Sequence, residues 1–387
     1  MVRVALLTNE ITPYRVSLYC ALAGTPGWEF RVMYCAEREI GRSWESSASA
    51  AFQRKKSRTV SCVRHIHHRG PAIYSDDRMV HIPVGLLHDL SEYRPDVVIS
   101  GEMGARTLIA AAYAWTRHKP LLIWFYGTAH TERHSSVAQR LLRSFLVWQA
   151  KAFVGMGTDA RRYLCSLGVR PDRVFDAPNG EECAHWAGAL SPDVRESVRA
   201  RHGVQGLCYL YVGRMIPLKG LEDLLRAWSV FQRGLPGAAT LMLVGDGGEE
   251  RRLRDIAGRL CGDSVRFVGF TERAELPALY QAADVFVMPS LQDAWSRVMG
   301  EAMASGLPVL ASRYDGSTAD LVVEGKNGWT FDPLNEPDIV AKLRLAWDSR
   351  TQLETMGACG REVIARMDTE CMANGFRRAV ECALSEE

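Results

Sequence analysis

Hydrophobic and polar positions alternate along this chain in a pattern that predicts strands and helices in turn. Short apolar runs bounded by turn residues, such as 97–100 and 121–125, are typical of buried strands. The stretches between them repeat their apolar positions every three to four residues, which indicates helices. The strands predicted in the first half are 2–7, 30–34, 59–63, 97–100, 121–125, 152–155 and 174–176. The helices predicted between them are 16–23, 83–90, 105–117 and 137–150.

The second half repeats this alternation more clearly, after an acidic connector at about 181–206. At this spacing, alternating strands and helices predict an α/β protein of two Rossmann-like domains, each with a doubly wound parallel sheet and with a cleft between them. The strands predicted here are 208–213, 240–244, 265–268, 285–288 and 309–311. The predicted helices are 221–231, 249–260, 274–281, one between 296 and 306, 336–347, 351–365 and 369–385.

The length of 387 residues fits two domains of ordinary size. We place the first domain at 1–187 and the second at 188–365, and we expect a final helix at 366–387 to pack back toward the first domain. Between 37 and 69 the chain is polar and irregular, which predicts a surface loop with one edge strand. Five histidines between 65 and 88 lack the spacing of metal ligands and indicate solvated surface instead.

Composition limits the class of protein. The ten cysteines are scattered without a C-x-x-C pair, which argues against a zinc site and favours reduced thiols in a cytoplasm. Every long apolar run is broken by charged residues, so we expect no membrane span, and polar residues cut the first strand too short for a signal peptide. Residues 1–190 carry a net charge of +7 and the remainder −5, which suggests different partners for the two halves.

The stretch 284–309 carries the first candidate chemistry. Asp293 sits in the loop after an apolar strand, and Ser296 is placed to cap a helix that Gly306 ends. Glu301 lies eight positions after Asp293, inside that helix. The two carboxylates therefore flank the free N–H groups of a helix N-terminus, which suits a phosphate surrounded by hydroxyl groups. The alternative is a strand, loop and helix with two solvated acids.

A second polar group follows the strand 208–213. Arg214 and Lys219 flank a loop that opens the helix at 221. Two cations over a helix N-terminus suit a diphosphate, because arginine supplies a planar fork and lysine a movable point charge. The alternative is a pair of solvated surface cations. The glycine-rich run 245–248 is not a dinucleotide fingerprint, which argues against a dehydrogenase.

Six motifs follow one another in a fixed order within about 205–335. They are G-R-x(4)-K-G at 213–220, V-G-D-G at 244–247, V-x-F-x-G at 265–269, A-D-V-F-V-x-P-S at 283–290, the acidic loop and helix at 293–309, and G-x-N-G at 325–328. In this order the chain resembles the donor domain of the retaining glycosyltransferases of family 4. The resemblance implies that family's GT-B fold, in which two Rossmann-like domains face each other across a cleft.

The resemblance also implies roles for the residues of these motifs. Arg214 and Lys219 would hold the diphosphate of a nucleotide sugar, Asp293 would meet the hexose hydroxyls, and Glu301 would bind the ribose. These four residues are the ones expected to act in catalysis, and the last strand residues at 268–269 would contact the base. The expected donor contacts are Arg214, Lys219, Val268, Gly269, Asp293, Trp295, Ser296, Arg297, Val298 and Glu301. Neither a metal nor a cofactor is implied, since the nucleotide sugar is a substrate.

Three residues in and just before the donor helix depart from the family's pattern. Asp293 stands where glutamate is commoner, and Ser296 replaces a glycine that lets the donor approach the backbone. If Ser296 caps its own helix, it uses an N–H that the donor would otherwise bind. Arg297 puts a cation at a helix N-terminus, which costs about 0.3–1 kcal/mol unless an anion lies nearby.

The first domain departs further. The loop 9–15 replaces a glycine-rich loop, and its Pro-Tyr-Arg run resembles family members with sugar-polymer acceptors. A histidine of the family's cleft corresponds here to Tyr126 or, three residues past Gly127, to His130. The expected cleft contacts of this domain are Thr12, Tyr14, Arg15, Tyr126 and His130.

The function implied is that of a retaining, metal-independent hexosyltransferase. It would move a hexose from a UDP- or GDP-linked sugar to a carbohydrate or lipid-linked glycan, in the synthesis of a cell-surface polysaccharide or glycolipid. Arg140 and Arg143 accompany apolar residues in the helix 137–150. This mixture suggests that the enzyme is cytoplasmic and that this helix rests on the inner face of an anionic cell membrane. The alternative is that those apolar residues form an ordinary core face. No nucleic-acid partner is expected.

Three other functions stay open. One is transfer to a small soluble natural product. Another is a non-catalytic subunit that binds sugar nucleotides, which Ser296 and Arg297 suggest. The third is a sugar-nucleotide epimerase of the same fold, which the R-x(4)-K and D-x(7)-E spacings do not support.

Overall fold

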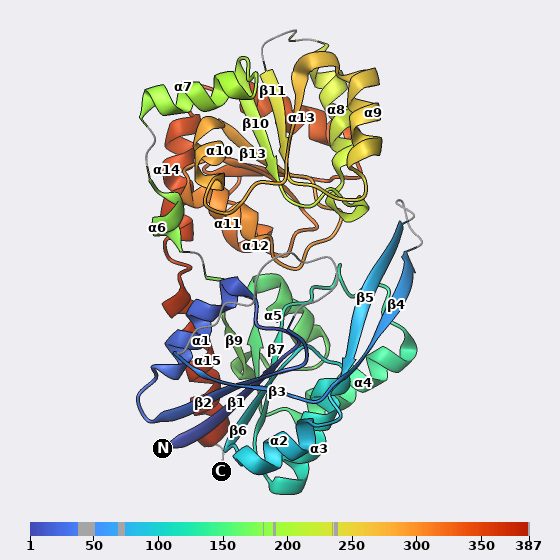
Figure 1. Cartoon of the computed structure of the whole chain (residues 1–387), viewed down its shortest axis with the longest axis vertical. Coiled ribbons are helices and arrows are strands. Elements are labelled where there is room, and N and C mark those ends of the chain that lie inside the picture. Colours follow the sequence, from blue (N-terminus) through green and yellow to red (C-terminus); the bar gives the residue numbers. More distant parts are fainter. Residues whose placement is uncertain are drawn as a thin grey trace. The chain divides into compact units, whose positions relative to one another are not determined.

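The computed structural model describes residues 1–37, 51–68, 74–180, 182–188, 191–233, 235 and 239–385. The chain forms two compact units (Figure 1). Unit 1 comprises Met1–Gly180 and Thr369–Glu387, and unit 2 comprises Glu181–Asp368. The sequence placed these divisions at 187 and 365. Each unit is built on its own parallel sheet.

Unit 1 is organised around a seven-stranded sheet in the order β3-β2-β1-β6-β7-β8-β9. The chain steps outward from β1 to β3 and then returns to β6, so the strand order reverses between β1 and β6. Open sheets of this kind bind ligands at the carboxyl ends of the strands beside such a reversal. The strands are β1 (Val2–Thr8), β2 (Trp28–Tyr34), β3 (Gln53–Lys56), β6 (Val97–Gly101), β7 (Leu121–Phe125), β8 (Ala152–Gly155) and β9 (Val174–Asp176).

The helices of unit 1 bury apolar side chains against this sheet. Those of α2, α3, α4 and α5 join one apolar core with the strands. The last helix, α15, also belongs to unit 1, where it contacts α1, β8 and β9, and its Phe376 ring meets the Trp124 ring edge-on at 5.1 Å. The helices are η1 (Pro13–Arg15), α1 (Val16–Ala23), α2 (Leu86–Tyr93), α3 (Ala105–Arg117), α4 (Val137–Gln149), α5 (Gly157–Ser166), η2 (Pro171–Arg173) and α15 (Thr369–Ser385).

The polar stretch that begins at 37 is more structured than predicted. β3 pairs with β2 as an edge strand of the sheet. Beyond it, β4 (Val60–His68) and β5 (Tyr74–Ile82) form a separate antiparallel hairpin, which projects from unit 1 (Figure 1). The predicted loop with one edge strand was therefore incomplete, because a two-stranded ribbon outside the core needs no regular apolar face. Residues 38–50 and 69–73 lie outside the described part of the chain.

The helix α4 meets neither expectation in full, because only part of its apolar residues form a core face and one of its two arginines is buried. Arg143 was expected at the surface, but it is buried, because it pairs with the Glu132 carboxylate and donates to the Ser135 and Tyr163 hydroxyls. The core face of α4 is made by residues 142, 146 and 147. A second apolar stripe, on the outer face, stays exposed and comprises Val137, Leu141, Phe145 and Trp148.

Unit 2 has a six-stranded parallel sheet in the order β12-β11-β10-β13-β14-β15, which reverses between β10 and β13. The strands are β10 (Leu207–Val212), β11 (Ala239–Val244), β12 (Val265–Gly269), β13 (Val285–Met288), β14 (Val309–Ser312) and β15 (Gly328–Phe331). The helices are α6 (Cys183–Trp186), α7 (Pro192–Arg201), η3 (Pro217–Lys219), α8 (Leu221–Gln232), α9 (Glu250–Leu260), η4 (Gly262–Ser264), α10 (Leu276–Ala282), α11 (Arg297–Ala304), α12 (Thr318–Leu321), α13 (Glu336–Asp348) and α14 (Leu353–Ile364). The predicted site residues of this unit lie at the carboxyl end of β12 or follow those of β10 and β13.

Candidate functional site

The carboxyl end of β10 in unit 2 presents an unpaired cation. β10 stops at Val212, and the chain continues through Gly213 and Arg214 to η3. Arg214 is exposed, and its guanidinium forms no hydrogen bond or ion pair with any other residue that the structure describes. A free guanidinium at this edge of a parallel sheet is available to bind an anion.

A close approach of two loops holds the second predicted cation, Lys219. Gly220 has a left-handed backbone with a φ of 64°, and a Cβ atom built on it would lie 2.1 Å from the carbonyl oxygen of Pro289. Only glycine fits this position. The Lys219 ammonium thereby lies 2.5 Å from the Asp293 carboxylate, with the two side chains 17% and 21% exposed. The structure thus brings together two residues that are 74 positions apart in the sequence.

Asp293 lies in the loop between β13 and α11, where the sequence placed it. Its Oδ1 accepts a hydrogen bond from the Trp295 N–H at 3.2 Å. Its backbone is fastened to the next loop, between β14 and α12, because its N–H donates to Tyr314 and its carbonyl accepts from Gly316. The loops that follow two neighbouring strands are therefore held side by side.

Ser296 occupies the N-cap position of α11, but its hydroxyl does not cap the helix. The Oγ is buried and has no hydrogen-bond partner among the described residues. The Ser296 N–H instead points at the neighbouring loop, 3.3 Å from Asp315 Oδ1 and 3.4 Å from Ser317 Oγ. The predicted cap is wrong because these bonds fix the Ser296 backbone. No side-chain cap hydrogen bond occupies the N-terminus of α11.

Glu301 is buried on the inner side of α11. Its Oε2 accepts a hydrogen bond from the Tyr280 hydroxyl at 2.9 Å. Tyr280 is fully buried on α10, and the ring of Trp186 meets it edge-on at 5.6 Å. This packing fixes the position of one oxygen of the Glu301 carboxylate.

The other predicted donor residues lie on two parts of the same edge. Trp295 is buried just before α11, and the first two residues of that helix, 297 and 298, are half-buried. Val268 and Gly269 end the edge strand β12, where the Gly269 carbonyl accepts the Gly245 N–H at 2.8 Å. The β12 residues are thus separated from the Asp293 loop by β11 and β10.

Asp315, which sequence reasoning missed, lies at the centre of this group. It follows β14 and is 1% exposed. Its Oδ1 accepts hydrogen bonds from the Ser317 N–H at 2.9 Å and from the Ser317 hydroxyl at 2.6 Å. Burial, and then the nearby carboxylate of Asp293, raise the pKa of Asp315 to about 6. The available signal was an Asp-Gly-Ser run that begins three residues after an apolar strand, similar to the loop acid that marked Asp293.

Unit 1 gathers a second polar group where its strand order reverses. The Arg15 guanidinium lies over the Trp124 ring, 4.4 Å from the ring centroid. The rings of Tyr14 and Tyr126 are both 5.8 Å from the same guanidinium. Three of the residues predicted for this domain, at positions 14, 15 and 126, are therefore neighbours.

Glu102, which was not predicted, joins this second group. It follows β6 directly and has a left-handed backbone with a φ of 68°, which is uncommon outside glycine. Its carboxylate accepts the Tyr126 hydroxyl and, at 3.5 Å, the Asn9 amide. Burial, and then the Glu102 charge, raise the pKa of Tyr126, which keeps that hydroxyl protonated. Strained non-glycine residues concentrate at functional sites, so Glu102 marks this edge of unit 1 as a candidate.

The two remaining residues predicted for unit 1 occupy different loops. Thr12 precedes η1, is buried, and has an Oγ1 without a hydrogen-bond partner in the described part of the chain. His130 lies in a turn after β7, where its carbonyl accepts a hydrogen bond from the Arg133 guanidinium at 2.5 Å. No function is assigned to either by these contacts.

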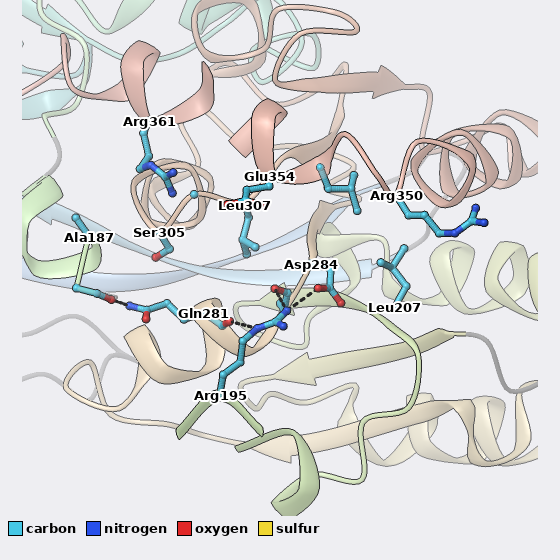
Figure 2. A pocket seen from close by; sticks show the side chains of 14 residues that line it. Ala187, Arg195, Leu207, Gln281, Asp284, Ser305, Leu307, Arg350, Glu354 and Arg361 are labelled. Atoms are coloured by element: carbon cyan, nitrogen blue, oxygen red, sulfur yellow. Dashed lines mark hydrogen bonds and ion pairs between the residues drawn. The ribbon is translucent and has the colours of Figure 1, made fainter. Parts of the chain in front are cut away.

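A pocket of about 460 Å³ lies at the opposite edge of the unit 2 sheet, where β10, β13 and β14 begin (Figure 2). Within it, Arg195 of α7 donates to the Asp284 carboxylate at 2.6 Å and to the Gln281 carbonyl at 2.9 Å. Asp284 also accepts the Cys208 N–H at 2.7 Å. These charges fasten α7 to the starts of two strands, and no predicted site residue lines the pocket.

The described residues contain neither a cluster suited to a metal ion nor a helix that could span a membrane. Among the described residues, no three His, Cys, Asp or Glu side chains are grouped so that they could hold a metal ion. Over the same ranges, no helix has both the length and the apolar character needed to cross a membrane. The ten cysteines are free thiols.

Comparison with known proteins gives matches of two kinds. Residues 195–363 match the family described as glycosyl transferases group 1. The chain is 37% identical over 309 residues to the sulfoquinovosyl transferase of Arabidopsis thaliana, which covers 76% of this chain and 58% of that protein. It is 31% identical over 280 residues to the glycogen synthase of Mycobacterium tuberculosis, which covers 70% of this chain and 64% of that protein. The matched segments span less than two thirds of both relatives.

The solved structure of Anabaena HepE in complex with UDP is similar to this chain with a TM-score of 0.76. The two are 17% identical, and the match covers 98% of this chain and 100% of HepE. At this level of identity the likeness concerns the fold alone. It confirms the predicted GT-B fold.

Proposed function

We propose that the chain is a group 1 glycosyl transferase, the family that residues 195–363 match, and that it transfers a hexose from a nucleoside-diphosphate sugar to a hydroxyl group. The proposed acceptor is a carbohydrate or lipid-linked glycan, in the synthesis of a cell-surface polysaccharide or glycolipid. One observation carries the donor half of this proposal. At the carboxyl edge of the unit 2 sheet, Arg214 is unpaired and Lys219 contacts Asp293, beside a helix N-terminus that no side chain caps.

The diphosphate binds between Arg214 and Lys219 in this proposal. Its negative charge attracts the free guanidinium and competes with Asp293 for the Lys219 ammonium, while the N-terminus of α11 adds its partial positive charge. Asp293, once released, can accept hydrogen bonds from the hexose hydroxyls. Glu301, whose Oε2 accepts the Tyr280 hydroxyl, binds the ribose diol in this proposal.

The proposed chemical step retains the configuration of the sugar. The bond between the anomeric carbon and the diphosphate oxygen breaks, and the acceptor oxygen bonds to that carbon on the same face. The acceptor proton passes to an oxygen of the leaving diphosphate. Arg214 and Lys219 stabilise the charge that develops on the diphosphate, and Asp293 orients the hexose. The step uses neither a side-chain nucleophile nor a metal ion.

The nucleotide is proposed to be UDP or GDP, with the base against the end of β12. HepE, which is similar in fold, was crystallised with UDP, so UDP is the first candidate. Val268 and Gly269 would meet the base through their backbone, at the end of the edge strand.

Unit 1 is proposed to touch an anionic membrane on the cytoplasmic side through α4. The outer stripe of this helix is 42–75% exposed, and its spacing of four, four and three residues places the side chains on one face. Arg140 is exposed on the same helix and supplies a positive charge. Such a face can lie in the headgroup region without spanning the bilayer. This contact would bring the enzyme to a lipid-linked acceptor.

A ligand screen tests the donor half of the proposal. A nucleotide at 100 times its dissociation constant stabilises the folded protein by roughly 2.7 kcal/mol, which raises the melting temperature measurably. We expect UDP or GDP, and their hexose conjugates, to raise it, and we expect slow hydrolysis of the matching sugar donor without acceptor. Binding without any hydrolysis or transfer would instead support a non-catalytic sugar-nucleotide-binding subunit. No stabilisation by any of these ligands would contradict the proposal.

A further inference from the structure

One buried carboxyl group joins the two loops that follow β13 and β14 in unit 2. Asp315 accepts the Ser296 N–H from the neighbouring loop and both the N–H and the hydroxyl of Ser317 from its own. All three bonds end on Oδ1. Oδ2 is buried and has no hydrogen-bond partner within the part of the chain that the structure describes. A carboxylate buried with one oxygen unused is destabilising unless a proton or a ligand compensates it.

A second buried atom without a partner lies in the same pair of loops. It is the Ser296 Oγ, three residues after Asp293. Asp293 and Asp315 form a bridge between the loops, and the Lys219 ammonium is the positive charge that acts on both carboxyl groups. Two acids and one cation are therefore arranged where the sugar donor is proposed to bind.

We propose that Asp315 is a positioning residue of the donor site, which holds Asp293 in place for the hexose and takes up a proton when the donor engages Lys219. This inference rests on the function proposed above, because it requires a nucleoside-diphosphate sugar at this site. It adds to that function a residue that no motif assigns and a proton linked to donor binding.

The charges at the site set the direction of this effect. In the structure, Lys219 offsets part of the repulsion between Asp293 and Asp315. A bound diphosphate adds negative charge and draws Lys219 away, and both changes make a charged Asp315 less favourable. The unliganded pKa of Asp315 is already raised to about 6 by burial and by Asp293, so a further rise brings it toward neutrality. The proton goes to Asp315 because it is more deeply buried than Asp293.

The other charged groups on the surrounding elements do not replace Asp315 in this role. Arg313 and Tyr314 lie on the same loop, and both contact Asp332 instead. Tyr211 lies on β10, and its burial, followed by the charge of Asp293, raises its pKa, so it stays protonated. Arg297 opens α11, and its guanidinium is a hydrogen-bond donor only.

Calorimetric titration of the full chain with UDP-glucose, or with GDP-mannose if UDP-glucose does not bind, tests the inference. These conjugates are suitable because their diphosphates, unlike the terminal phosphate of UDP, do not titrate near neutral pH. Titrations at pH 5.5–8 in two buffers of different ionisation enthalpy count the protons taken up. We expect the protein to take up protons on donor binding near pH 7. We also expect its affinity for the donor to rise as the pH falls, by up to about tenfold for each unit by which the donor raises the Asp315 pKa.

Three variants separate a proton-linked role from a merely structural one. Asp315→Asn is expected to remove both the proton uptake and the pH dependence. Ser317→Ala removes a hydrogen bond to the charged Asp315 carboxylate, so it should move the midpoint of the pH dependence of donor affinity to higher pH. This variant serves as the test if Asp315→Asn does not fold. Asp255→Asn, at an exposed position of α9, should behave like the parent.

The outcomes distinguish this inference from the function on which it rests. Donor binding without proton uptake in the parent, or with the same uptake in Asp315→Asn, would overturn the role of Asp315 and leave the donor site intact. A pH midpoint of donor affinity in Ser317→Ala that equals that of the parent would also overturn the role of Asp315. Failure of the parent to bind either nucleotide sugar would overturn the proposed function, and the inference would fall with it.

Discussion

The two units place polar residues at the same edge of their sheets but use them differently. In unit 1 the charged side chains at this edge are engaged by neighbours. Arg15 lies over Trp124, Glu102 accepts the Tyr126 hydroxyl, and Arg106 donates to the Asn9 side chain and the Gly101 carbonyl. Such mutual pairing stabilises a loop arrangement before any ligand binds.

In unit 2 the corresponding groups retain unused binding capacity. Arg214 has no partner among the described residues, and the Ser296 Oγ and the Asp315 Oδ2 are buried without hydrogen bonds. Buried polar atoms in folded proteins are rarely left in this state without a reason. Unit 1 also has such atoms at this edge, namely the Thr12 Oγ1 and the Nε atoms of Arg15 and Arg106, but both of its guanidinium groups are engaged by a ring or by other hydrogen bonds. The difference between the units is therefore the free guanidinium of Arg214, which supports the proposal of an anion site in unit 2.

Removing a charge that unit 1 uses internally should mainly affect stability. Arg143→Met leaves the mostly buried Glu132 carboxylate without its cation, which should lower the free energy of unfolding by roughly 3 kcal/mol, the low end for a broken buried ion pair. Urea denaturation measures this. Arg140→Met, at an exposed position of the same helix, should change stability by less than about 0.5 kcal/mol. Equal effects of the two variants would remove the contrast between the units.

Removing acids from unit 2 should mainly affect binding, and the two acids should differ. Glu301→Ala is expected to weaken free nucleotide and nucleotide sugar alike, by about 1.5–3 kcal/mol, because both ligands carry the ribose. Asp293→Ala should spare the free nucleotide and reduce turnover of the sugar donor. Titration with UDP and GDP, together with donor-hydrolysis rates, separates the two roles. The same loss of free-nucleotide affinity in both variants would contradict them.

The outer stripe of α4 should give a smaller effect, seen only with membranes. Leu141→Ser and Trp148→Ser are expected to reduce sedimentation with anionic vesicles without lowering stability by more than about 0.5 kcal/mol, because both side chains are exposed. High salt should weaken binding of the parent, since each basic residue near an anionic surface contributes about 1 kcal/mol. Val194→Ser, at an exposed position of unit 2, is the matched control. Binding that is insensitive to salt and to lipid charge would favour a soluble acceptor.

Much of the fold could be predicted because its central elements have regular apolar patterns. The helices 16–23, 105–117 and 369–385 end where the sequence placed them. The helix Gly157–Ser166 was missed because few of its residues are apolar, and the strand Gly328–Phe331 because glycine and threonine interrupt its apolar run. The hairpin β4–β5 was missed in part because it lies outside both sheets.

The residues of the candidate sites could likewise be predicted only in part. Arg214 and Asp293 could be proposed from local sequence, since each follows an apolar strand and precedes a helix. Glu102 and Asp315 also follow strands, but what distinguishes them depends on contacts across the fold. The partner of Glu102 is 24 positions away, and Asp315 bonds a residue 19 positions away. Local patterns carry no information about such pairs.

Calorimetric titration of the parent and of the double variant Arg214→Ala/Lys219→Ala with UDP and GDP tests whether unit 2 binds a nucleoside diphosphate at this edge. Each lost charge-assisted hydrogen bond should weaken binding by about 1.5–3 kcal/mol, so the double variant should lose at least a hundredfold in affinity for the nucleotide that the parent prefers. Arg366→Ala, which removes an exposed arginine elsewhere in unit 2, should bind like the parent. A double variant that folds and titrates with the affinity of the parent would contradict the diphosphate site.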